Sequence, residues 1–230
     1  MLPGSCLCMH SGQHLHLLPQ KALYWAEERT LVIADLHVGK AAHFRRHGVP
    51  VSGQVQQEDL RRLAALIHAL DPERLLFLGD LSHSAHNAEW ETFAAFIRPY
   101  DFPKLLIRGN HDILAASAYA DAQIAVHASE FAPGPFVFTH EPPSEAHPEG
   151  LYALSGHIHP GVLIGGAGRQ KLRLPCFHFG PKGAVLPAFG GFTGLAPIKP
   201  EAGDQVFVVG EEEVLGPISG IRPAESGAFG

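Results

Sequence analysis

The stretch Leu31-Val32-Ile33-Ala34-Asp35-Leu36-His37 places an acidic residue and a histidine directly after a short apolar run. An apolar run of this length, bounded by polar residues, is typical of a strand that is buried on both faces of a sheet. The arrangement recurs at 75–80, 105–112 and 136–140, where apolar runs lead to Gly-Asp, Gly-Asn-His-Asp and Thr-His. The sequence therefore predicts strands that deliver polar side chains at their carboxyl ends.

Segments with helical spacing lie between these strands. Two sets of apolar residues recur every three or four positions: Leu60, Leu63, Ile67 and Leu70, and then Trp90, Phe93, Ala94 and Ile97. Asn87, a residue type favoured at helix N-caps, precedes the second set. Alternating strands and helices predict right-handed crossovers between parallel strands, with ligand-binding groups at the carboxyl ends of the strands.

Beyond His159 the sequence changes to short β-like runs separated by glycine and proline, at 161–164, 171–174, 176–179, 184–186 and 205–209. These runs predict a second sheet, packed face to face with the first and with helices outside, in one domain that spans residues 1–230. Residues 141–150 are expected to form an exposed loop, and the tail after Gly210 is expected to fray.

Composition narrows the class of protein. Apolar residues make up 46% of the chain and charged residues 17%, a balance that favours a buried core over disorder. The sequence has no apolar run near the ~20 residues that cross a bilayer, so we expect an unexported, cytoplasmic protein without a membrane partner. The three cysteines, Cys6, Cys8 and Cys176, are an odd number, which argues against a disulfide framework and for a reducing compartment.

Charge is distributed unevenly along the chain. The formal net charge of −6 argues against a wholly basic, nucleic-acid-binding surface. However, residues 36–57 and 150–200 contain no acidic residue and hold 8 of the 17 lysines and arginines. Phosphate contacts come mostly from lysine and arginine, so we consider four basic residues as candidates for substrate binding: Lys40, Arg45, Arg46 and Arg108. Chance placement of the basic residues on separate faces is the alternative.

Five polar blocks carry the candidate chemistry, in the order Asp35-Leu36-His37, Gly79-Asp80, Gly109-Asn110-His111-Asp112, Thr139-His140 and Gly156-His157-Ile158-His159. Carboxylate, imidazole and amide ligands without an obligatory thiolate suit Mn, Fe or Zn. In an extended chain residues i and i+2 point the same way, so Asp35 and His37 could direct two ligands into one cleft. Two divalent cations held by two aspartates would keep a net positive charge, which attracts a phosphate group.

A single histidine is more often a core or surface residue than a metal ligand, and only the joint order of the blocks argues for ligands. We therefore interpret most of the other histidines as non-ligands, His43 among them. His83, three residues after Asp80, is the candidate for a further ligand.

In this order the blocks resemble the calcineurin-like metallophosphoesterase superfamily, whose motifs run D-x-H, G-D, G-N-H-[DE], H and G-H-x-H. The resemblance implies an α/β fold, a four-layer αββα sandwich of two mixed β-sheets packed face to face with flanking helices. It also implies two metal ions. One would bind Asp35, His37 and His159, the other would bind Asn110, His140 and His157, and Asp80 would bridge both, with His111 beside the scissile phosphate.

Further stretches, 34–46 (ADLHVGKAAHFRR), 174–177 and 186–190, resemble the ligase-associated DNA damage response endonucleases of the PdeM family. Ser82 departs from the bulkier residue expected at its position in that pattern. The resemblance implies DNA as the substrate, and a DNA ligase and a helicase as partners.

The predicted function is that of a metal-dependent phosphodiesterase or endonuclease in DNA repair, in which two divalent ions activate a hydroxide. Manganese is the expected metal, with iron or zinc as alternatives. His111 would protonate the leaving oxygen or stabilise developing charge, oriented by Asp80 or Asp112. A phosphatase or cyclic-nucleotide diesterase with a small substrate fits the acidic net charge. A catalytically dead scaffold should have lost ligands, and none is missing from the motifs.

Overall fold

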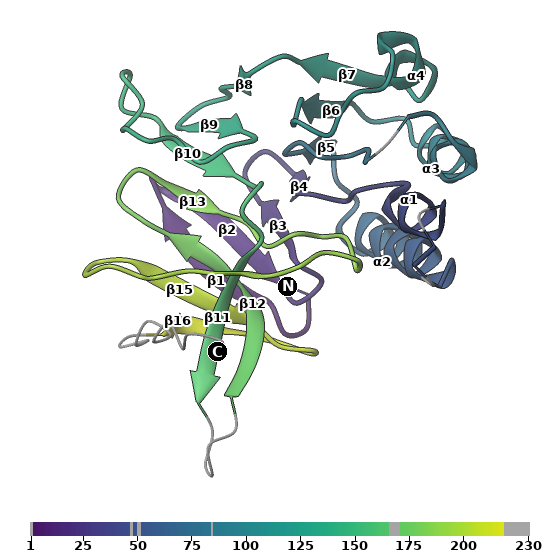
Figure 1. Cartoon of the computed structure of the whole chain (residues 1–230). Helices are drawn as coiled ribbons and strands as arrows, with labels where there is room; N and C mark the ends of the chain where they lie inside the picture. The colour runs from purple at the N-terminus through teal and green to yellow at the C-terminus, as the bar shows by residue number, and fades with distance from the viewer. Residues whose placement is uncertain (1, 47, 50–51, 84, 166–170, 219–230) are drawn as a thin grey trace.

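The structure is a computed structural model that describes residues 2–46, 48–49, 52–83, 85–165 and 171–218, without the side chains of Arg46 and Lys171. It contains two mixed β-sheets, with helices beside the first (Figure 1). Within these residues, no helix is long and apolar enough to span a membrane. The three cysteines are free thiols, as predicted, and Cys8 and Cys176 are buried.

The first sheet has the strand order β1-β2-β3-β4-β5-β6-β7. Its strands are β1 (Cys6–His10), β2 (Gln13–Leu18), β3 (Ala22–Trp25), β4 (Thr30–Ile33), β5 (Arg74–Phe77), β6 (Lys104–Ile107) and β7 (Ile124–His127). Strands β1 to β4 are antiparallel neighbours, whereas β4 to β7 are parallel, as the alternation of strands and helices predicts. The register pairs Ile33 with Phe77, so β4 and β5 end side by side.

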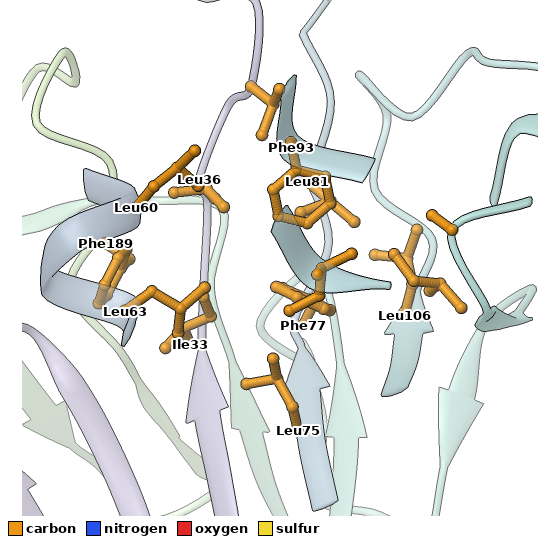
Figure 2. Close-up of a cluster of buried hydrophobic side chains, with 14 of the residues drawn as sticks. Ile33, Leu36, Leu60, Leu63, Leu75, Phe77, Leu81, Phe93, Leu106 and Phe189 are labelled. Carbon is orange, nitrogen blue, oxygen red and sulfur yellow. The ribbon is translucent and has the colours of Figure 1, made fainter. Parts of the chain in front are cut away.

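Within the described residues, four helices, all before residue 122, lie beside this sheet: α1 (Lys40–Arg46), α2 (Gln54–Leu70), α3 (Ala88–Ile97) and α4 (Ala116–Asp121). The Asn87 side chain accepts hydrogen bonds from the backbone N–H groups of Glu89 and Trp90, which confirms the predicted N-cap of α3. Figure 2 shows how helices and sheet pack together: Leu63 of α2 and Phe93 of α3 lie in one buried cluster with Phe77 of β5.

Apolar side chains of the parallel strands alternate between two cores. Ile33 and Phe77 face the helices, whereas Val32 and Leu76 belong to a second core between the two sheets. Phe138 and Phe177 reach this second core from the other sheet. Burial on both faces explains why these strands appear in the sequence as continuous apolar runs.

The second sheet has the order β14-β11-β12-β13-β10-β9-β8, with β15 paired to β12 and β16 paired to β15. Its strands are β8 (Glu130–Phe131), β9 (Phe136–Thr139), β10 (Tyr152–Ser155), β11 (Pro160–Gly165), β12 (Lys171–Phe179), β13 (Gly183–Val185), β14 (Ala196–Pro197), β15 (Gln205–Val209) and β16 (Val214–Ile218). Two predicted runs, 171–174 and 176–179, form the single strand β12. Two mixed sheets with helices confirm the predicted α/β sandwich.

The outer face of the second sheet differs from that of the first. Cys176, Val206 and Val208 form a small apolar cluster there, while their neighbours Phe177 and Phe207 face the core between the sheets. Among the described residues, no helix covers this outer face, since the four helices lie beside the first sheet (Figure 1). Helix packing is therefore confined to the sheet whose parallel strands the helices connect.

Several elements have no clear signal in the sequence. Strand β2 has His14 and His16 among its leucines, β1 and β3 have only five and four residues, and α4 has six residues, too few to show a helical period. Strand β16 extends regular structure into the stretch after Gly210, of which residues 219–230 lie outside the described chain. Residues 141–150 form turns and bends, as predicted.

Candidate metal centre

The candidate site lies where strands of both sheets end. Asp35 follows β4, Asp80 follows β5 and Asn110 follows β6, so the parallel register places the three blocks at one edge of the first sheet. Backbone pairing continues beyond the strand ends, because the N–H of His37 donates to the carbonyl of Asp80 at 2.8 Å. The second sheet contributes His140, directly after β9, and the loop between β10 and β11.

The backbone of the site is unusual. Five residues of the motifs adopt left-handed φ angles of 48 to 69°: Asp35, His37, Asp80, His157 and His159. Such angles are uncommon for residues other than glycine, cost on the order of 1–3 kcal/mol each, and cluster at functional sites. The explanation that Asp35 and His37 converge because they lie in an extended chain is therefore wrong. They converge because the chain turns sharply at each residue.

The first group of candidate ligands consists of Asp35, His37 and His159, with ligand atoms that all lie within 4.8 Å of one another. The Nε2 atom of His159 lies 3.3 Å from Nε2 of His37 and 3.6 Å from Oδ1 of Asp35. Asp35 and His37 are buried, and His159 is partly buried. The backbone N–H of His157 donates to Oδ2 of Asp35 at 2.9 Å, which orients this carboxylate.

The second group consists of Asp80, His140 and His157, within the same 4.8 Å limit. The Nε2 atom of His140 lies 3.4 Å from Oδ1 of Asp80, 3.1 Å from Nδ1 of His157 and 3.1 Å from Oδ1 of Asn110. His157 and Asn110 are exposed, so this group opens toward solvent. The structure thus adds Asn110 to the neighbourhood of the second group, as the resemblance implies.

Asp80 lies between the two groups. Its Oδ1 atom faces His140 of the second group, and its Oδ2 atom lies 3.8 Å from Nε2 of His37 in the first. The backbone N–H of His111 donates to Oδ1 of Asp80 at 3.0 Å and holds the carboxylate in this position. Each oxygen of one carboxylate is therefore directed at a different group, as a ligand shared by two cations requires.

The protonation of the histidines fits metal binding. Burial, with Lys40 and His159 nearby, lowers the pKa of His37 to about 2, so its imidazole is neutral. The Nδ1–H of His140 donates to the carbonyl of Leu78 at 2.9 Å, which leaves the Nε2 lone pair directed into the site. Neutral imidazoles and carboxylates are the ligand forms that divalent cations bind. The donor set therefore fits two such ions.

Glycines of the motifs allow these side chains to approach closely. A Cβ atom at Gly79 would overlap the ring of His140, and one at Gly156 would lie 2.7 Å from Oδ2 of Asp35. Gly79 also has a φ of 78°, which side chains rarely permit. Glycine is required at both positions because the ligands fill the space.

His111 and Asp112 have different surroundings. The His111 ring is 42% exposed, with Nε2 4.0 Å from Oδ2 of Asp80. Asp112 is buried and points away from that ring, since its Oδ1 accepts from the Ser82 N–H at 2.8 Å and its Oδ2 accepts from the Gly109 N–H at 2.9 Å. Of the two carboxylates considered for orienting His111, Asp80 is the one that faces its ring, and Asp112 braces the surrounding loops.

His83 lies outside both ligand groups but contacts the site. Its ring stacks on that of His111 with centroids 4.6 Å apart, and its Nδ1 lies 3.3 Å from Nδ1 of His37. His43 is interpreted from the sequence as a non-ligand. Its ring centroid lies 5.5 Å from that of His83. A lone histidine in α1 carries no signal in the sequence, because only the packing of α1 brings it here.

The predicted basic residues are placed unequally. Lys40 is partly buried near the centre, where burial lowers its pKa while the charges of Asp80 and Asp35 oppose that shift. Arg45 forms an ion pair with Glu89 of α3. Arg108 is exposed at the end of β6, and the side chain of Arg46 lies outside the described structure. Lys40 thus lies near the metal centre, whereas Arg45 is paired with Glu89.

Two mixed sheets with paired aspartate–histidine groups at their edge define a metal-dependent hydrolase. The sequence matches the family model of the calcineurin-like phosphoesterase over residues 28–180, and the chain belongs to this family. It is therefore a metal-dependent phosphoesterase, as predicted.

Among solved structures, the chain is similar to the nuclease MPE of Pseudomonas putida, with 34% identity and a TM-score of 0.77 over 92% of this chain and 100% of that chain. This similarity is consistent with the narrower resemblance to the PdeM family. The phosphoesterase Yfce from E. coli shows 14% identity and a TM-score of 0.43, over 81% of this chain and 96% of that one. It is too distant to inform function. No curated protein matches the sequence significantly.

Proposed function

We propose that the protein is a two-metal phosphodiesterase that hydrolyses phosphodiester bonds in DNA. The observation that carries the proposal is the position of Asp80, whose two oxygens face the two ligand groups. A shared carboxylate holds two cations close enough to act on one phosphate. The similarity to a nuclease supports a phosphodiester substrate.

The chain would hold one divalent ion with Asp35, His37 and His159, and the other with Asn110, His140 and His157. Manganese is the expected ion, with iron or zinc as alternatives, since oxygen and imidazole donors without thiolates suit all three. Such ions would supply the positive charge that binds the phosphate and makes a water nucleophilic near neutral pH.

His111 is the proposed acid. Its ring is partly exposed beside Asp80, so it can reach a phosphate at the centre. As an imidazolium it would donate a proton to the leaving oxygen or stabilise charge on the phosphate. Asp80 orients the residue through the hydrogen bond that its Oδ1 accepts from the backbone of His111.

Basic residues would contact the phosphates that flank the scissile bond. Lys40, near the centre, and Arg108, exposed after β6, are placed for this role. Arg45 would have to exchange its ion pair with Glu89 for a phosphate. A cytoplasmic role in DNA repair, beside a ligase and a helicase, rests on the resemblance of residues 34–46, 174–177 and 186–190 to the PdeM family.

A phosphatase with a small substrate is the second candidate. The net charge of −6 and the exposure of His157 and Asn110 favour it, since a small phosphate could reach the open group without a basic track.

One panel of substrates separates the two functions. Hydrolysis of bis-p-nitrophenyl phosphate, p-nitrophenyl phosphate, and single-stranded and nicked DNA is measured with Mn²⁺ and after complete chelation. We expect metal-dependent hydrolysis of the diester and of DNA, and loss of both in Asp80→Ala, while the exposed control Asp121→Ala keeps full activity. Activity that survives chelation would contradict the metal-dependent site, and hydrolysis of the monoester alone would select the phosphatase.

Binding of a single-stranded oligonucleotide as a function of salt tests the basic contacts. Neutralised phosphates release counterions, so log affinity should fall with log salt, and Lys40→Ala should reduce the slope by about 1. A flat dependence in the unaltered protein would exclude these contacts.

A further inference from the structure

A cavity of about 290 Å³ lies beside the candidate metal centre. Ile158, which forms part of its wall and is 40% exposed, stands between the candidate ligands His157 and His159 in the chain. Consecutive Cα atoms are about 3.8 Å apart, so this wall directly adjoins both ligand groups. Pro142, two residues after His140, belongs to the lining as well. The wall of the cavity therefore begins one residue from candidate ligands of both groups.

The lining combines apolar surface with a few polar groups. Ile158, Pro142, Pro143 and Pro181 supply apolar surface. A second set of lining residues carries formal charges of both signs that cancel: Lys182, Lys199, Glu201 and Asp204. A cavity with balanced charge and apolar walls does not suit an isolated anion. It suits a largely neutral group with apolar faces and a polar edge.

Two contacts build the cavity. The Lys182 ammonium group donates to the carbonyl of Ser144 at 2.5 Å and so fastens the 141–150 loop to the turn between β12 and β13. His178, in the lining, has its Nε2 atom 2.7 Å from Oδ2 of Asp204, of which the side chain is 5% exposed. This pair ties β12 to the segment before β15. Three polar groups of the lining, those of Lys182, His178 and Asp204, are thus held in place by contacts between separate segments of the chain.

We propose that this cavity binds the nucleobase of the nucleotide next to the scissile phosphate. The inference rests on the proposed phosphodiesterase function, because the base is linked through its sugar to the phosphate that the metal centre would hold. A base offers apolar faces to Ile158 and the prolines, and hydrogen-bonding edges to the polar groups. The exposed Lys199 is placed to contact the next phosphate of the strand.

The test compares diesters that share one leaving group. Methyl p-nitrophenyl phosphate has no base, whereas the p-nitrophenyl esters of thymidine 5′-phosphate and thymidine 3′-phosphate carry one on either side. With Mn²⁺, we expect one of the two nucleoside esters to show a KM about tenfold lower than the methyl ester, because the base buries apolar surface. The ester that gains the advantage identifies the side of the phosphate on which the cavity acts.

Variants link this advantage to the cavity. Gly180, in the lining, has room for a Cβ at 3.4 Å from its nearest neighbour, so Gly180→Leu should place a side chain in the cavity. It should remove the tenfold advantage and leave the methyl ester unaffected. Gly165→Leu, on strand β11, is the matched control, since the added Cβ has no atom of the described residues within 4 Å apart from its chain neighbours. Lys199→Ala should raise KM for a dinucleotide more than for the single-nucleoside esters.

The outcomes distinguish the two proposals. If the methyl ester is hydrolysed with Mn²⁺ but neither nucleoside ester has an advantage, the base site is wrong and the phosphodiesterase stands. The base site is also wrong if the advantage persists in Gly180→Leu while the variant remains folded by circular dichroism. If no diester is hydrolysed, the phosphodiesterase proposal fails, and the base site fails with it.

Discussion

The two candidate ligand groups differ in how the protein encloses them. The first group has two buried members and one partly buried member, and Lys40 and His83 pack around it. The second group has an exposed histidine, His157, and an exposed neighbour, Asn110. The comparison separates two tasks: the closed group is suited to retain an ion, and the open group is suited to admit a substrate.

The surroundings of each group follow from the chain that supplies it. The first group takes two of its three members from the turn after β4, directly beside α1. The second takes two of its three members from the second sheet, next to the cavity lined by Ile158 and Pro142. We therefore expect substitutions in the first group to affect mainly metal retention, and those around the second to affect both metal and substrate.

The largest effect is expected where the two groups meet. Asp80→Asn keeps the shape of the side chain but removes the charge that both groups share, so both ions should bind weakly. We expect kcat/KM for a phosphodiester to fall at least ~10³-fold, with metal content below one ion per chain in elemental analysis. Retention of two ions with normal turnover would show that Asp80 does not join the groups. Asp121→Asn serves as the control.

His111 should affect turnover without affecting either group. His111→Ala is expected to lower kcat about 10²-fold, because it removes an acid near the leaving oxygen, while two ions per chain remain bound. The exposed His86, which pairs with Glu91, provides a control substitution, His86→Ala. Loss of metal in His111→Ala would assign the residue to the centre itself.

The difference in enclosure predicts different rescue by metal. His159→Ala removes a ligand from the first, closed group, where we expect the apparent Mn²⁺ affinity to fall about 100-fold. In His157→Ala, water can take the place of an exposed ligand, so a loss of about tenfold should be overcome by raising Mn²⁺. Activity measured against Mn²⁺ concentration tests the order. Equal losses would remove the distinction between a closed and an open group.

The smallest effect is expected at the support of α1, on the side of the first group. Glu89 accepts from the backbone N–H of Ala42 at 3.3 Å and pairs with Arg45, and so ties α1 to α3. A partly exposed ion pair is worth little, so Glu89→Gln should raise KM about two- to fivefold at unchanged kcat. Glu91→Gln, on the same helix, is the control. A change in kcat would contradict this expectation and would show that α1 affects the catalytic step as well as substrate binding.

Helices α2 and α3 and the parallel strands β4, β5 and β6 were predictable because their signals are local. Apolar runs such as 31–34 reflect burial on both faces, and the spacing of Trp90 and Phe93 reflects one buried face of a helix. The first hairpins were not predictable, since polar residues such as His14 and His16 interrupt their pattern. The short helix α1 was not predicted from the sequence either, because an ion pair between Arg45 and Glu89, which are distant in the chain, holds it in place.

The sequence by itself determined the ligand types and their order, because each block is a few adjacent residues that end a strand with a local signal. Only the tertiary structure decided which groups meet. It turned Asp112 toward Ser82 and away from His111, stacked His83 on His111, engaged Arg45 with Glu89, and opened a cavity beside Ile158. These contacts join residues far apart in the chain, and they depend on sheet register and helix packing, which no short stretch of sequence specifies.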